Sequence, residues 1–321
     1  MTESILLPRI LLTNDDGFDA PGLAVLAEVA QDFAREVWIV APTSDQSGAG
    51  SSVSLHEPLR CHTRSERQWS IDGTPGDCVA IALSHFMAAT PPSLILSGVN
   101  AGANVGDEIN MSGTIGAALT SLMLGVPAIA ISQAFTSRDA IRWDTARAIL
   151  PKTLSHLLAR GWRKETVLTI NIPDLPAAEV TGLGWARQSQ KNIAALEADF
   201  RISPRRHEYF WLSVKRQPPI ETDNSDSALL KRGKVAVTAM SSDRSLDLGK
   251  PDFSFLKHDN NAEKIDEFDI TADELSDMEE SLPDFHIPEA PETENSDSET
   301  TAPPSPALQA MHKRRAHGRR R

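Results

Sequence analysis

Two adjacent carboxylates stand near the start of the chain, where Asp15 and Asp16 follow a short apolar run at residues 10–12 and precede Gly17. The apolar run is typical of a buried strand, and ligands of parallel α/β sheets bind just beyond the carboxyl ends of their strands. Adjacent carboxylates repel each other, so the pair indicates a bound cation. On these residues alone, an Asx turn with two solvated acids is the alternative.

Two further loops rich in small residues follow predicted strands. Residues 43–52 come after a strand predicted over residues 36–41, and residues 97–107 come after one predicted over residues 94–96. The side chains at these strand ends offer oxygen rather than sulfur or imidazole, which favours Mg²⁺, Mn²⁺ or Ca²⁺ over zinc. We therefore expect a hard divalent cation on four ligands: Asp15, Asp16, Ser47 and Asn100.

The same edge of the predicted sheet has the features of a phosphate site. Glycines in the loops allow N–H groups to point inward at an anion, and Ser112-Gly113-Thr114 opens a helix whose N-terminus favours an anion. A hard cation beside a bound phosphate, lowering the pKa of a coordinated water, predicts hydrolysis of a phosphoester. We expect catalytic roles for Asp15, Asp16 and Asn104, and substrate contacts from Asn14, Gly48, Asn104, Ser112, Gly113 and Thr114.

Each of these residues also has a purely structural interpretation. Ser47 could be a turn residue, Ser112 a helix cap, and Asn100 a partner for the loop backbone. Other nucleotide-binding and hydrolase motifs do not occur, since the chain contains no GxxxxGK[ST], no GxSxG and no GxGxxG after a strand. The grouping of polar residues at three strand ends therefore supports the hypothesis of metal-dependent phosphate chemistry.

Strands and helices alternate over residues 1–175, which predicts an α/β body with a doubly wound, mostly parallel sheet. Strands are expected at residues 10–12, 36–41, 94–96, 127–131 and 167–172, and helices at residues 23–33, 75–86, 115–124 and 140–159. A hairpin is expected from residues 53–62 and 68–71.

The pattern then changes to a smaller β-rich extension over residues 176–257. Strands are expected at residues 180–185, 207–214 and 234–238, with a more polar stretch at 191–204 and a short helix at 222–230. These strands are too sparse to bury a core of their own, and exchanging them between protomers would bury them at little extra cost. We therefore expect at least a homodimer.

Residues 258–321 are acidic and then basic, with few large apolar side chains. Such a composition predicts a disordered tail, because burial cannot offset the entropy of ordering it. Exposed charges are screened at physiological salt, so we expect the tail to be dispensable for catalysis and assembly. Contact of the basic end with nucleic acid is the alternative.

Composition narrows the class of protein. The formal net charge of the 321 residues is −12, and much of it belongs to the tail, so it says little about the substrate. The two cysteines make no disulfide framework, and no apolar run approaches the length of a membrane span. The sequence therefore predicts a soluble cytoplasmic protein.

The motifs taken together resemble the SurE family, the survival-protein-E nucleotidases, from about residue 10 to residue 240. The resemblance implies a Rossmann-like body, removal of phosphate from nucleoside 5′- and 3′-monophosphates, some activity on short polyphosphate, and one Mg²⁺ or Mn²⁺ per subunit. It places the metal on the four side chains chosen above, and it implies dimers or tetramers built by exchange of the extension. The matching segments are LLTNDDG, DQSGAGSSVSL, DGTPGDCVAIAL, LSGVNAGANVGDEINMSGTIGAAL, LGVPAIAIS, INIPD, EYFWL and ETDNSDSALLKRGKVAVTAM.

The chain departs from the family pattern in two places. Met111 stands where the family often has an aromatic residue, and residues 224–227 replace a stretch that is often aromatic. These changes bear on the substrate preference or on the packing of the extension that the family pattern would imply. A protein that senses a nucleotide and a metal without hydrolysis, and signals through its charged tail, is the competing hypothesis.

Overall fold

The computed structural model describes residues 6–245. The tail predicted over residues 258–321 lies outside the described residues. Within these residues the main sheet has nine strands in the order β3-β4-β2-β1-β5-β6-β7-β11-β8. Its central strands pair in parallel, as predicted. They are β1 (Leu7–Thr13), β2 (Ala34–Pro42), β5 (Leu94–Ala101), β6 (Ala128–Gln133) and β7 (Val167–Ile172).

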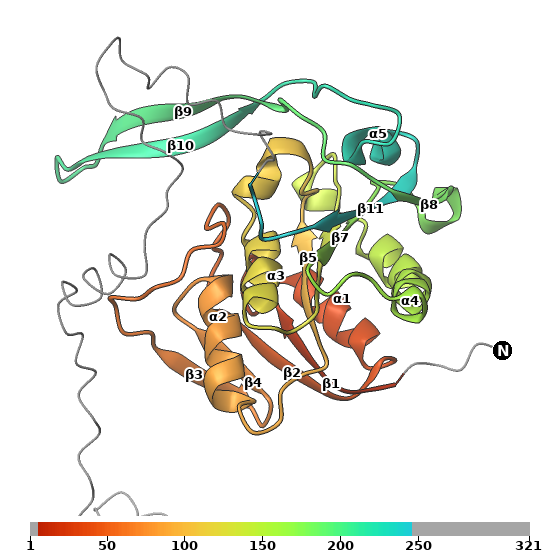
Figure 1. The fold of residues 1–321 in the computed structure, drawn as a ribbon. Coiled ribbons are helices and arrows are strands. Elements are labelled where there is room, and N and C mark those ends of the chain that lie inside the picture. The colour runs from red at the N-terminus through yellow and green to blue at the C-terminus, as the bar shows by residue number, and fades with distance from the viewer. Residues whose placement is uncertain (1–5, 246–321) are drawn as a thin grey trace, which may run out of the picture. The chain divides into compact units, whose positions relative to one another are not determined.

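Helices cover both faces of this sheet, which gives the predicted doubly wound architecture (Figure 1). One face carries α1 (Pro21–Ala30) and α4 (Trp143–Arg160), and the other carries α2 (Pro75–Ile81) and α3 (Gly113–Met123). The π-helix η1 (Ala82–Phe86) continues α2, and the 3₁₀-helices are η2 (Gly106–Asn110), η3 (Arg138–Ala140) and η4 (Ala177–Glu179).

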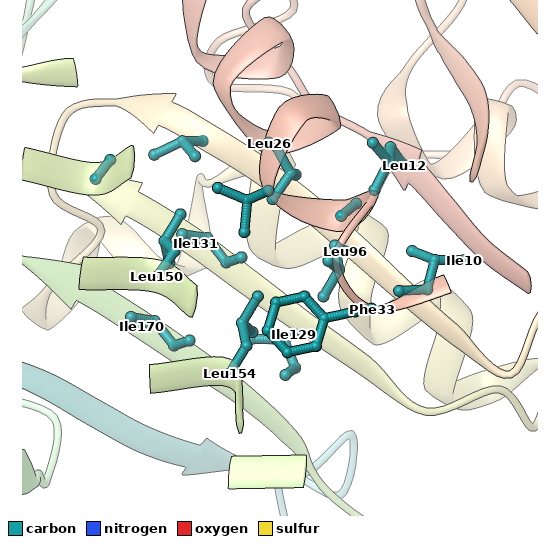
Figure 2. Close-up of a cluster of buried hydrophobic side chains, with 14 of the residues drawn as sticks. Ile10, Leu12, Leu26, Phe33, Leu96, Ile129, Ile131, Leu150, Leu154 and Ile170 are labelled. Carbon is teal, nitrogen blue, oxygen red and sulfur yellow. The ribbon is translucent and has the colours of Figure 1, made fainter. Parts of the chain in front are cut away.

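Strand β1 is buried on both faces because its apolar side chains alternate between two hydrophobic clusters. Ile10 and Leu12 pack with α1 and α4, as Figure 2 shows, whereas Leu11 packs on the side of α2 and α3. All three side chains are completely buried. This continuous apolar run is the expected composition for a central parallel strand, and it fixes the position of the aspartates that follow it.

Two strands of the body differ from the sequence-based expectation. The hairpin strand β3 (Cys61–Ser65) begins eight residues later than predicted and pairs with β4 (Gln68–Ile71). Within the predicted strand, the Ser54 N–H donates to Asp77 in the cap of α2 at 2.7 Å instead of to a neighbouring strand. Strand β5 is longer than predicted, since it continues to Ala101 beside β6.

The extension contributes to two sheets. Strands β8 (Gly182–Trp185) and β11 (Lys234–Met240) complete the edge of the main sheet, while β9 (Ile193–Ile202) and β10 (Glu208–Arg216) form a separate hairpin that projects from the body (Figure 1). The sequence analysis missed β9, although apolar and charged residues alternate along its second half. Helix α5 (Asp226–Lys231) begins later than predicted, because Ser225 closes a turn on Thr222 with a backbone bond of 3.0 Å.

Candidate active site

The three polar loops meet at one edge of the sheet because β1 lies between β2 and β5. The chain turns to one side of β1 to form β2 and later returns to its other side to form β5, so the strand order reverses there. Crevices at such reversals are the common ligand sites of open α/β sheets. Asp15 and Asp16 follow β1 directly and therefore lie at this reversal.

Asp15 is held on two sides by segments distant in the sequence. Its side chain is buried and accepts a hydrogen bond of 2.5 Å from the Thr114 hydroxyl at the start of α3. Its carbonyl oxygen accepts the N–H of Gln46 at 2.7 Å, which ties the loop after β2 to the same point. Burial raises the pKa of Asp15 from 3.8 to about 6, the charge of Asp16 adds to the rise, and the Thr114 hydrogen bond opposes it.

Asp16 faces the third loop. Its Oδ2 accepts the N–H of Ala101, at the end of β5, at 2.8 Å. Partial burial raises the pKa of Asp16, as does the negative charge of Asp45, whereas the Ala101 N–H and the positive charge of Arg138 lower it. The two aspartates therefore connect all three strand-end loops and the first turn of α3.

Glycines allow helix α3 to approach this centre closely. A side chain at Gly113 would place its Cβ 2.8 Å from the Asp15 Cβ, and one at Gly116 would meet the Gly50 carbonyl oxygen at 1.9 Å. The Gly50 N–H also donates to the Met111 carbonyl at 3.0 Å. The loop after β2, in which Ser47 and Gly48 are exposed, is thus fixed against the helix.

Two predicted substrate contacts in α3 have internal partners. The Ser112 side chain accepts the Ile115 N–H at 3.1 Å, which makes it the cap of the helix, and Thr114 is completely buried against Asp15. The Ser112 cap is the structural alternative considered above. A contact of either side chain with a substrate remains a prediction. The free backbone N–H groups of this first turn are better placed to bind an anion than these two side chains are.

The asparagines at the site are oriented by hydrogen bonds. Asn100 donates its Nδ2 to the Gly102 carbonyl at 2.8 Å, which leaves its Oδ1 available as a ligand. Asn104 donates its Nδ2 to the Ser132 hydroxyl at 2.9 Å, and its backbone N–H and carbonyl both pair with the side chain of Asn171. Asn14 donates to the Gly17 carbonyl at 2.8 Å, and its buried Oδ1 has no partner among the described residues.

The donor set fits a hard divalent cation. Within residues 6–245 no ion pair reaches the carboxylate of Asp15 or Asp16, although the two are adjacent and largely buried. The described chain has no group of three or more His, Cys, Asp or Glu side chains that could hold a metal. Two carboxylates therefore need the neutral oxygens of Ser47 and Asn100, or water, to complete a coordination shell.

The sequence analysis missed the residues whose side chains hydrogen-bond the backbone of the site loops. Asn171, in β7, supports Asn104, while Asp226 and Asn192 contact the segment that follows Asn104. Asp226 lies in the very stretch identified as a departure from the family pattern. These contacts join residues far apart in the sequence, and a pattern read along the chain gives no signal for them.

Fold and site together define a Rossmann-like α/β protein with an acidic, oxygen-lined centre at the reversal point of its sheet. The family model described as survival protein SurE matches residues 10–195. The chain is 50% identical over 242 residues to 5′-nucleotidase SurE 1 of Burkholderia lata, covering 75% of this chain and 93% of that protein. It is 42% identical over 241 residues to 5′-nucleotidase SurE of Bradyrhizobium diazoefficiens, covering 74% and 94%.

A solved structure agrees with these relatives. The crystal structure of the SurE protein from Aquifex aeolicus superposes with a TM-score of 0.64 at 30% identity, covering 74% of this chain and 95% of that one. The chain belongs to the SurE family. Among the described residues no helix has the length and apolar character needed to cross a membrane.

Proposed function

We propose that the chain is a divalent-metal-dependent phosphatase that hydrolyses nucleoside 5′-monophosphates, and 3′-monophosphates as well, to nucleoside and phosphate. The observation that carries this proposal is the pair Asp15 and Asp16: Asp15 is buried against the start of α3, Asp16 is partly buried beside it, and neither forms an ion pair within residues 6–245. The curated relatives named 5′-nucleotidase support the same activity. The sensor hypothesis has no comparable support.

The cation would be held by Asp15, Asp16, Ser47 and Asn100, and we propose Mg²⁺ or Mn²⁺ because all four ligands are oxygen atoms. When bound, the ion supplies positive charge and Lewis acidity at the phosphate oxygens. The chain contributes the fixed arrangement around it. Thr114 orients the Asp15 carboxylate, and the Ala101 N–H orients that of Asp16.

The phosphate itself would lie against backbone donors. The first N–H groups of α3 belong to the end of the helix at which Gly113 lies against Asp15, and a helix N-terminus favours the charge of a phosphoryl group. Gly48 adds an exposed backbone position with φ +86°, where no Cβ limits approach. Asn104, fixed by Ser132 and Asn171, would keep its amide aligned with the phosphate as charge develops on the oxygens.

Phosphate release from a panel of nucleotides tests the proposal directly. We expect the protein to release phosphate from AMP with Mn²⁺ or Mg²⁺, and excess EDTA to abolish release. Asp15→Asn should lower the rate by about a hundredfold or more, comparable to the loss of a key electrostatic group. Full turnover by folded Asp15→Asn would refute the assignment, and tight AMP binding without any release would favour a sensor.

We also propose that the extension mediates assembly into a homodimer or homotetramer. In the β9–β10 ladder, directly opposed residues share a face, and apart from Glu208, which is opposite Ile202, one face carries apolar side chains: Leu196, Ala198, Phe200, Ile202, Phe210, Leu212 and Val214. Most of them are exposed within this chain, and the large residues reach 49–74% exposure. An apolar face of this kind on an isolated hairpin favours burial against a second copy of the chain.

Light scattering at micromolar concentration tests the assembly. Leu212→Asp places a charge on the apolar face and should shift the population toward monomer. Ser213→Asp places the same charge on the opposite face of β10 and serves as the matched control. A monomeric parent protein, or equal effects of the two variants, would contradict assembly through this face.

The division into a body over residues 1–175, an extension over residues 176–257 and a tail beyond is likewise a proposal. Its extension shares the main sheet through β8 and β11, so we expect the body to need these strands for stability.

We also propose a cytoplasmic location, since Cys61 and Cys78 are both free thiols. Cell fractionation with an antibody against the protein checks the location.

A further inference from the structure

We propose that Asp226 is a positioning residue for the phosphate half of the site, acting through the segment over residues 103–111. The inference rests on the proposed function in that this segment carries Asn104 at its start and leads directly into the Ser112 cap of α3. Asp226 itself lies at the start of α5, in the extension, and its carboxylate hydrogen-bonds Gly106, Ser189 and Ser227, none of which is a predicted site residue.

The Asp226 carboxylate is completely buried and is saturated by backbone donors. Its Oδ2 accepts the N–H of Gly106 at 3.0 Å, and its Oδ1 accepts the N–H groups of Ser189 at 3.0 Å and Ser227 at 2.7 Å. No ion pair within residues 6–245 involves it. A buried carboxylate with one bond to Gly106 and two within the extension therefore works as a bridge between them.

A second side chain of the extension forms hydrogen bonds to the same segment. Asn192 accepts the Asp107 N–H with its Oδ1 at 2.7 Å and donates its Nδ2 to the Val105 carbonyl and to Glu108, each at 3.2 Å. It is also buried. With Asp226, it satisfies the N–H groups of two consecutive residues, so the backbone of the segment is fixed at both.

The fit at this point leaves no room for a side chain. Gly106 has φ +57°, and a Cβ there would lie 2.6 Å from the Asn192 Oδ1 and 3.0 Å from the Ser189 hydroxyl oxygen. The Gly106 carbonyl accepts the Nε2 of Gln188 at 2.8 Å. The extension thus holds both polar groups of this residue, and a change in the extension must move the segment or lose these bonds.

The hydrogen bonds of Asp226 and Asn192 to residues 105–108, called the clamp below, lie on the phosphate side of the site. Residues 103–111 contain no predicted metal ligand, whereas Asp15 and Asp16 are held by Thr114, Gln46 and Ala101, none of which Asp226 contacts. Loosening the clamp should therefore displace Asn104 while Thr114 keeps its hydrogen bond to Asp15, so that no metal ligand is disturbed. Phosphate affinity should therefore fall while Mn²⁺ affinity stays the same, a difference that general destabilisation of the protein would not produce.

Asp226→Asn is the test variant. The amide keeps the volume of the carboxylate, but its Nδ2 cannot accept a hydrogen bond, so at least one of the three N–H groups loses its partner. We expect kcat/KM for AMP to fall about tenfold to a hundredfold, as a displacement of about 1 Å can do. Inhibition by inorganic phosphate should weaken about tenfold or more, since the phosphate contacts are those displaced.

The affinity for Mn²⁺ alone, measured by titration calorimetry, should stay within about threefold, because loss of a direct support of the metal ligands would cost about tenfold to a hundredfold. Leu154→Ala is the control for stability, since it removes a buried side chain of α4, which covers the face of the sheet opposite to α3. It should lower the melting temperature and leave phosphate inhibition unchanged.

Asn192→Ala provides a second variant if Asp226→Asn does not fold. It should show the same split between phosphate and Mn²⁺, and the double variant should lose less than the sum of the single losses because both act on one segment. Unchanged phosphate inhibition in folded variants, or equal loss of Mn²⁺ and phosphate affinity, would overturn the inference. A parent protein that binds phosphate yet hydrolyses no nucleotide would refute only the proposed function.

Discussion

Replacing Asp15 by asparagine should make the metal-free protein more stable above about pH 6. The folded protein binds the Asp15 proton more tightly than the unfolded chain does, because burial raises the pKa from 3.8 to about 6. Proton binding to Asp15 therefore favours the folded protein. This contribution to the free energy of unfolding is complete below pH 3.8 and is lost as the pH rises through 6. At about 1.4 kcal/mol per pH unit, the loss is about 3 kcal/mol.

The asparagine variant avoids this loss. Its Oδ1 can still accept the Thr114 hydroxyl, and it carries no charge to repel Asp16. We expect the free energy of unfolding at pH 8 to rise by about 1–3 kcal/mol, and to be nearly unchanged at pH 4, where the wild-type carboxyl is largely protonated in the folded protein.

Urea unfolding of EDTA-treated protein at the two pH values measures this difference. Asp19→Asn, the same substitution at an exposed position four residues away, controls for the change in net charge and should have little effect. Added Mn²⁺ should reverse the order of stability, since an ion at about 100 times its Kd stabilises the wild type by about 2.7 kcal/mol and has lost a ligand in the variant. A less stable variant at pH 8, or a difference independent of pH, would refute the reasoning.

Three further predictions concern the same site and the tail. Thr114→Val removes the hydroxyl donor from Asp15 while keeping the side-chain shape, and calorimetry should show Mn²⁺ affinity about tenfold weaker. Gly113→Ala forces a Cβ against Asp15 and should lower the AMP hydrolysis rate by about tenfold or more. Gly125→Ala, strained by its φ of +79° but with no atom within 4 Å of the new Cβ, should lower stability and leave that rate unchanged. Truncation at Lys257 should leave kcat/KM for AMP within about threefold, and a folded, oligomeric truncation with little activity would contradict this.

The sequence predicts those parts of the fold in which local pattern and tertiary packing agree. Strand β1 is predicted because Ile10, Leu11 and Leu12 are all apolar, and burial on both faces of the sheet requires this. The order β2-β1-β5 places the loops that follow these three strands together, as expected when neighbouring parallel strands end at one edge of a sheet. The start of α2 is likewise predicted from Thr74 and Pro75, and the structure shows a capping box there.

The remaining features depend on partners that a local pattern does not contain. Asn100 reads as a loop residue, yet it belongs to β5 because β6 pairs with it at Ser132. The Thr114 hydroxyl bonds a residue 99 positions earlier, and Gly106 bonds a carboxylate 120 positions later. Such pairs become visible only when the chain is folded, which is why Asp226 appears in the sequence as one acidic residue among several.

The number of hydrogen-bond donors distinguishes Asp15 from two other buried carboxylates of this protein. The buried carboxylate of Asp77 accepts three bonds, from Ser54 N–H, Ser54 hydroxyl and Thr74 N–H, and that of Asp226 also accepts three. The Asp15 side chain accepts only the Thr114 hydroxyl as a side-chain bond, and nearby backbone N–H groups oppose the rise of its pKa without preventing it. We therefore expect the unused acceptor capacity of Asp15, next to the charge of Asp16, to be taken up by a cation when the carboxylate is ionised.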